Sequence, residues 1–162
     1  MGKPSKGLFT PKNPQKYLGK NLNKIIYRSS WELTCCLFFF DNNPSVIGWI
    51  SESIPSNHVH SGISGIPYRN PFTGRWTIYV PDFFVTYVDK HHKQHAEVME
   101  IKPLQEVPPM MSGVAVKVNK LTEAKQILNA AKYAAAIEFC SERGWYFRVV
   151  TERDLFAWAK PR

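Results

Sequence analysis

Two β-type runs near the middle of the chain constrain its fold most. Residues 76–88 first alternate between apolar and polar side chains and then become almost wholly apolar, which predicts two strands separated at Pro81. A second run, 97–102, also has strand character and ends at Pro103, because proline cannot donate to a strand ladder. The sequence therefore predicts a group of short strands in this region.

Three charged side chains accompany these strands. Glu100 and Lys102 are two residues apart, so they share a face of one strand, and Asp82 reaches the same space if its strand pairs beside that one. Neighbouring carboxylates repel each other, and a hard cation with oxygen ligands removes that cost, which favours Mg²⁺ (with Mn²⁺ as a substitute) over Zn²⁺. A lysine beside such a metal can orient or deprotonate water at a phosphate. The pattern predicts a metal-dependent phosphodiesterase, although an exposed Glu100–Lys102 pair on an edge strand would look the same.

The composition limits the classes of partner that the chain is expected to bind. A net charge of +8 and an isoelectric point near 9.5 favour a polyanion, and nucleic acid ranks before an anionic membrane because no basic amphipathic helix stands out. The longest apolar run, 33–40, is too short to span a bilayer, and the polar, basic start predicts no secretory signal. Three cysteines, an odd number in apolar surroundings, are expected to be reduced core thiols in an intracellular protein.

The first 24 residues are rich in lysine, proline and glycine, and they predict an extended basic arm before a domain spanning 25–162. Lys12, Lys16 and Lys20 are the candidate DNA contacts of this arm. A solvated tail is the alternative.

Helices and further strands are expected around the central runs. The pattern predicts a helix over 29–40, a strand over 45–51, a loop over 53–65, an irregular connection over 103–118, a helix over 119–143, a strand over 145–150 and a short terminal helix from Thr151.

Glu32 lies at the start of the first helix and has two possible roles. Ser29 and Glu32 form a capping-box pattern, in which the glutamate side chain accepts from the Ser29 amide. The same acid could instead lie near a metal. Arg28, directly before the helix, could hold a phosphate through two hydrogen bonds or be an ordinary surface arginine.

The long helix carries a polar stripe made by Lys125, Asn129 and Lys132. Such a stripe is usually solvated, but this helix follows the Lys102 strand, so Lys125 and Lys132 are candidate DNA contacts. Three histidines, His91, His92 and His95, lie in a polar turn, for which a solvated loop is favoured over a zinc site.

Five segments taken together resemble a known family: 27–32, 46–52, 66–68, 79–83 and 100–103. Their order is similar to that in the head-completion nucleases of T-even-like tailed phages, which belong to the PD-(D/E)XK superfamily and resemble the endonuclease subunit of heteromeric transposases. The resemblance extends from about Lys12 to Phe156, and the chain departs from the compact family pattern between Glu52 and Ile66.

The resemblance implies an α/β fold with a restriction-endonuclease-like core, a mixed β-sheet flanked by helices. It implies that Asp82 and Glu100 are the main metal ligands, Ile101 a carbonyl ligand, Glu32 an acid near the metal and Lys102 the catalytic lysine. The implied activity is a Mg²⁺-dependent deoxyribonuclease, an endonuclease or end-processing enzyme that acts on DNA in phage head completion, after packaging and before tail joining.

The resemblance also implies a setting. The partners would be DNA and phage head or portal and neck proteins, without a membrane, in the host cytoplasm during assembly and then in the virion. The alternative is a non-catalytic, DNA-binding structural protein of the head or neck.

Overall fold

A four-stranded mixed sheet forms the centre of the computed structural model, which describes residues 6–55, 65–114 and 117–159. Its strands, in spatial order, are β3 (Val46–Ser51), β6 (Phe83–Val88), β7 (Gln94–Ile101) and β8 (Tyr146–Val150). The first three are antiparallel neighbours, whereas β7 and β8 run parallel. Parallel neighbours need a long crossover, and helix α3 (Lys120–Glu142) supplies it. The predicted fold class, a mixed sheet flanked by helices, is confirmed.

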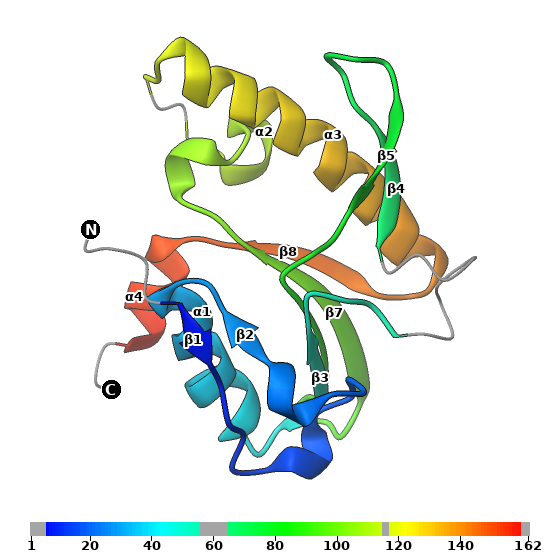
Figure 1. Ribbon diagram of the computed structural model, residues 1–162, viewed down its shortest axis with the longest axis vertical. Coiled ribbons are helices and arrows are strands. Elements are labelled where there is room, and N and C mark those ends of the chain that lie inside the picture. The colour runs from blue at the N-terminus through cyan, green and yellow to red at the C-terminus, as the bar shows by residue number, and fades with distance from the viewer. Residues whose placement is uncertain (1–5, 56–64, 115–116, 160–162) are drawn as a thin grey trace.

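Helices cover both faces of this sheet (Figure 1). Helix α3 lies across one face; Asn119 caps its first turn, and Gly144, with a φ of +71°, follows its end as predicted. The other face carries α1 (Ser30–Thr34), the π-helical turn η3 (Cys35–Asp41) and α4 (Glu152–Ala159). The π-helical geometry was not predicted.

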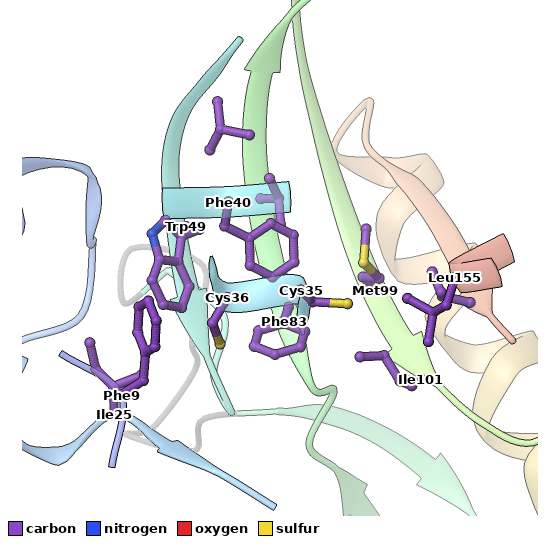
Figure 2. Close-up of a cluster of buried hydrophobic side chains, with 13 residues drawn as sticks. Phe9, Ile25, Cys35, Cys36, Phe40, Trp49, Phe83, Met99, Ile101 and Leu155 are labelled. Atoms are coloured by element: carbon purple, nitrogen blue, oxygen red, sulfur yellow. The ribbon is translucent and has the colours of Figure 1, made fainter. Parts of the chain in front are cut away.

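The core beneath α1 and η3 is largely aromatic (Figure 2). Phe40 packs edge-on against Phe83 with ring centroids 4.8 Å apart, and its ring lies 5.5 Å from that of the fully buried Trp49. Cys35 and Cys36 lie in the same core as free thiols, as expected, and Cys140 is a buried residue of α3 in the cluster on the other side of the sheet. This packing fixes the start of α1, and therefore Glu32, relative to the sheet.

The segment before α1 does not form the extended arm that its composition predicts. Phe9 is 7% exposed and packs on Trp49, and strand β1 (Gly7–Leu8) pairs with β2 (Ile26–Tyr27). Between them lie the 3₁₀ turns η1 (Pro14–Lys16) and η2 (Leu22–Lys24). The prediction is wrong for residues 6–24, because a few apolar side chains in this basic segment complete the core.

A buried carboxylate also holds this segment in place. Asp41, at the end of η3, is fully buried, and its side chain accepts hydrogen bonds from the amides of Lys12 (2.8 Å) and Asn13 (3.0 Å). A buried charge needs such donors, so the segment and η3 stabilise each other. The division of the chain at residue 24 stays a prediction.

A separate two-stranded ribbon leads into the sheet. Strands β4 (Ile66–Arg69) and β5 (Trp76–Tyr79) pair with each other, and Pro81 separates β5 from β6, as predicted. The predicted loop 53–65 lies mostly outside the described residues. The connection 103–118 contains two short helical turns, η5 (Leu104–Glu106) and α2 (Pro109–Ser112). Within the described part of the chain, no helix combines the length and apolar character needed to cross a membrane.

Candidate active site

Strand pairing brings Asp82 and Glu100 together. Phe83 pairs with Met99 across β6 and β7, so Asp82, just before β6, lies opposite Glu100. The Asp82 amide lies 3.3 Å from Glu100 Oε2, and the Ile101 amide donates to Asp82 Oδ2 at 2.8 Å. These two hydrogen bonds hold the carboxylates side by side at the edge of the core, as the pairing argument predicted.

Burial makes this pair electrostatically unfavourable without a counterion. Glu100 is 6% exposed, and burial raises its pKa. The pKa of Asp82 is raised well above its ordinary value, first by burial and then by the charge of Glu100. A hard cation between the two groups would relieve both costs.

The donor set of this pair fits magnesium better than a metal that needs a closed protein cage. Among residues 6–55, 65–114 and 117–159, no three His, Cys, Asp or Glu side chains gather as a metal-binding group. Mg²⁺ typically takes one or two carboxylates and completes its shell with water and phosphate oxygens. Asp82 and Glu100 match that requirement, and the carbonyl of Ile101 is a further candidate donor.

Lys102 extends from the same strand end. Its Nζ lies 3.7 Å from Glu100 Oε1, which agrees with a shared strand face, and its side chain is 30% exposed. The Lys102 amide donates to Val150 on the neighbouring strand at 3.0 Å. The ammonium group therefore faces both the carboxylate pair and solvent, where a phosphate could approach.

Tyr79 belongs to this site, and sequence reasoning missed it. Its hydroxyl donates to Glu100 Oε2 at 2.6 Å, and the residue is 3% exposed. This bond opposes the effect of burial on the pKa of Glu100. The only signal in the sequence was the place of Tyr79 three residues before Asp82, at the end of an alternating strand.

Glu32 reaches the site from α1, on the face of the sheet away from α3. Ser29 caps α1 as predicted, since its Oγ accepts from the Glu32 amide at 3.2 Å. The predicted return bond is different: the Glu32 carboxylate accepts from the amide of Arg28 and not from that of Ser29. Burial raises the pKa of Glu32, and its charge acts on Asp82. Glu32 is therefore both a helix-end acceptor and an acid facing the site.

Arg28 is paired within the protein. Its guanidinium forms an ion pair with Glu52, which follows β3. Glu52 has a φ of 52°, unusual for a residue with a side chain, and its amide donates to the Asp82 carbonyl at 2.8 Å. Sequence reasoning gave no role to Glu52; the structure places it between Arg28 and the Asp82 turn.

The two candidate lysines of α3, Lys132 and Lys125, lie in different surroundings: only Lys132 is near the carboxylate pair. Lys132 is half-buried, with Nζ 6.0 Å and 5.8 Å from the ring centroids of Tyr68 and Tyr79. Burial and then the charge of Lys102 lower the pKa of Lys132, whereas the charges of Glu100 and Asp82 partly offset this by raising it. Lys125 pairs with Glu106 at 3.6 Å, away from that cluster.

The third member of the predicted polar stripe is also buried. Asn129 is 4% exposed and donates to the Glu106 carbonyl at 2.9 Å. Of the stripe, the structure brings only Lys132 to the site.

The remaining candidate residues lie elsewhere. Lys16 Nζ donates to the carbonyls of Asp41 and Asn43, which lie just before β3, whereas Glu52 follows the other end of that strand. Lys12 and Lys20 are exposed on the same N-terminal segment as Lys16. His91 and His92 are exposed in the turn before β7, and His95 contacts Asp89 at 2.7 Å.

Comparisons with known proteins identify relatives of this chain. The sequence model of the family described as "TnsA-like endonuclease N terminal" matches residues 43–152, which include Asp82, Glu100 and Lys102. The chain is 33% identical to the "Head completion nuclease" of Enterobacteria phage T4 over 159 residues, 93% of each chain. No solved structure matches significantly.

Proposed function

Because this chain belongs to the family of TnsA-like endonucleases, we propose that it is a metal-dependent deoxyribonuclease of the PD-(D/E)XK superfamily. The observation that carries this proposal is the pair of buried carboxyls, Asp82 and Glu100, held side by side with the ammonium group of Lys102 3.7 Å from Glu100. A protein that only plugged or capped a DNA-filled head would need none of these three groups.

The residues of the site divide the chemistry between them. Asp82 and Glu100 would hold the cation, together with the Ile101 carbonyl and, on its water shell, Glu32. Bound Mg²⁺ would lower the pKa of water and offset charge on the scissile phosphate. Lys102 would orient or deprotonate the attacking water and stabilise the pentavalent phosphate. Tyr79 fixes one oxygen of Glu100 and leaves the other, Oε1, toward Lys102 and the substrate side.

The relative named a head completion nuclease supports a proposal for the biological role. We propose that this chain cleaves or trims DNA ends during phage head completion, after packaging and before tail joining. Its partners would be DNA and head or portal and neck proteins, in the host cytoplasm during assembly and then in the virion. The net charge of +8 supports a polyanionic substrate.

One assay tests the activity and its mode. The purified protein is incubated with closed circular, linear and overhang-bearing DNA, each in Mg²⁺, in Mn²⁺ and in EDTA. Cleavage of the circle indicates an endonuclease, and shortening of linear DNA alone indicates an end-processing enzyme. DNA binding without cleavage of any substrate in either metal would contradict the proposal and leave a non-catalytic head protein.

A further inference from the structure

The ribbon formed by β4 and β5, residues 66–79, has one face built into the protein. Ile66, Tyr68 and Tyr79 are buried and pack with Tyr133 and Ala136 of α3. In Figure 1 the ribbon runs beside α3 and its turn projects away from the four-stranded sheet. The buried face therefore anchors the ribbon, and its turn and outer face are free to meet a partner.

The free side combines aromatic and basic side chains. Phe72 is 58% exposed and Trp76 is 72% exposed, and Arg69 and Arg75 are exposed as well. Arg69 pairs across the ribbon with Trp76, so the two side chains lie on the same face. No aspartate or glutamate occurs between residues 66 and 81. The surface is positively charged and apolar, without a carboxylate of its own to balance the charge.

Local hydrogen bonds hold the turn in one shape. Asn70 Oδ1 accepts from the amides of Phe72 (2.8 Å) and Thr73 (3.2 Å), and the amide of Asn70 donates to the Arg75 carbonyl at 2.8 Å. Gly74 takes a φ of +71°, which favours glycine, and its carbonyl accepts from Arg69 Nε at 2.9 Å. A turn fixed in this way presents exposed aromatic side chains at little entropic cost on binding.

The ribbon is continuous with the active site. Tyr79, the last residue of β5, donates to Glu100, and Asp82 follows three residues later. At about 3.3 Å per residue, the six residue-to-residue steps from Trp76 to Asp82 span at most about 20 Å. That length corresponds to about six base pairs of duplex, counted at 3.4 Å per pair.

We propose that this ribbon binds duplex DNA beside the scissile phosphate by entering the major groove, an inference that rests on the nuclease function proposed above. The major groove admits a two-stranded β-ribbon, and arginines at the tip can contact phosphates or guanine edges. Trp76 and Phe72 supply apolar contact with sugars and base edges. The substrate class is thus duplex DNA that continues beyond the cut, along which the ribbon reaches at most about six base pairs.

The test compares ribbon variants with matched controls on two forms of DNA. Arg75→Ala removes a charge without changing the carbonyl that holds the turn, and Trp76→Thr removes the indole ring while placing another residue of high β propensity in the strand. Lys90→Ala and Phe38→Ala remove an exposed charge and a 61% exposed aromatic ring elsewhere on the protein. Affinity is measured by fluorescence anisotropy in EDTA, on a labelled 20-base-pair duplex and on one of its strands. Melting temperatures verify that each variant is folded.

Each ribbon variant should bind the duplex about tenfold more weakly than the parent, a loss of about 1.4 kcal/mol. Arg75→Ala should also reduce the slope of log affinity against log salt by about 0.9, as expected for one phosphate contact. Single-strand affinity, and both affinities of the two controls, should stay within about twofold of the parent, well below that tenfold step.

Two results would overturn the proposal. Equal losses on duplex and single strand would show stacking on unpaired bases, and duplex affinities equal to those of the controls would assign the ribbon to another partner, such as a protein. Failure of the proposed nuclease function gives a different result, namely no cleavage by the parent in Mg²⁺ whatever the ribbon variants bind.

Discussion

Replacing Tyr79 by phenylalanine removes one hydroxyl and keeps the buried ring, so it isolates the 2.6 Å hydrogen bond to Glu100. A hydrogen bond to a charged group contributes about 1.5–3 kcal/mol. Glu100 is 6% exposed, so solvent screens this bond little. If Glu100 is a metal ligand, the change should raise the Mg²⁺ concentration for half-maximal cleavage by about 10- to 100-fold, the usual cost of losing a partner behind a metal ligand.

The loss should depend on pH in a defined direction. The Tyr79 bond favours the charged form of Glu100, so its removal raises the pKa of Glu100 further above the ordinary value. The deficit of Tyr79→Phe should therefore be largest at low pH and shrink as pH rises. Cleavage rates titrated with Mg²⁺ at several pH values measure both effects.

Tyr133 provides a matched control for this experiment. It is a second fully buried tyrosine, its ring centroid lies 6.3 Å from that of Tyr79, and its hydroxyl has no hydrogen-bond partner among the described residues. Tyr133→Phe should leave the Mg²⁺ requirement unchanged and should not lower the melting temperature. Equal Mg²⁺ requirements in the parent and Tyr79→Phe, or equal shifts in the two variants, would refute the role given to the Tyr79 bond.

Three further predictions concern Glu32, Phe9 and Asp82. Glu32→Gln should cut cleavage by about 10² or more at unchanged melting temperature, whereas Ser29→Ala should cost about 0.5–2 kcal/mol of stability by losing the helix cap; parental cleavage by Glu32→Gln would leave Glu32 with a capping role alone. In urea unfolding, Phe9→Ala should destabilise the protein by about 3–5 kcal/mol, whereas Leu8→Ala, a change at the exposed neighbouring residue, should alter stability by no more than about 0.5 kcal/mol. Equal effects of the two substitutions would favour the extended, solvated arm that the sequence predicted. In the folded protein, the pKa values of Asp82 and Glu100 lie above their ordinary values of 3.8 and 4.5. In EDTA, these two groups therefore stabilise the fold at pH values below the ordinary pKa values, and this contribution is lost as pH rises through the raised ones. Asp82→Asn should accordingly unfold at a higher temperature than the parent near neutral pH, and a lower melting temperature would contradict the assigned pKa direction.

Local patterns predicted the parts of the site that lie on neighbouring strands. Period-two alternation placed Glu100 and Lys102 on one face, and the pairing of two close β runs brought Asp82 beside them. These relations follow from strand geometry alone, which is the same in any sheet.

The parts that depend on distant packing could not be predicted in this way. Tyr79 and Glu52 reach the site because the ribbon and the end of β3 converge there, and no spacing in the sequence encodes that approach. Composition failed for residues 6–24 for a related reason. Phe9 and the amides that bind Asp41 fix the segment, although its many lysines are typical of a solvated tail.

Single-turnover cleavage of duplex DNA in Mg²⁺ by the parent and by Lys102→Ala tests whether Asp82, Glu100 and Lys102 form a nuclease active site. The side chain of Lys102 is 30% exposed and faces the carboxylate pair, so its loss should leave the melting temperature and DNA affinity close to those of the parent. We expect Mg²⁺-dependent cleavage by the parent and none detectable by Lys102→Ala. Cleavage by Lys102→Ala at the parental rate would remove the lysine from the mechanism and contradict the active site described above.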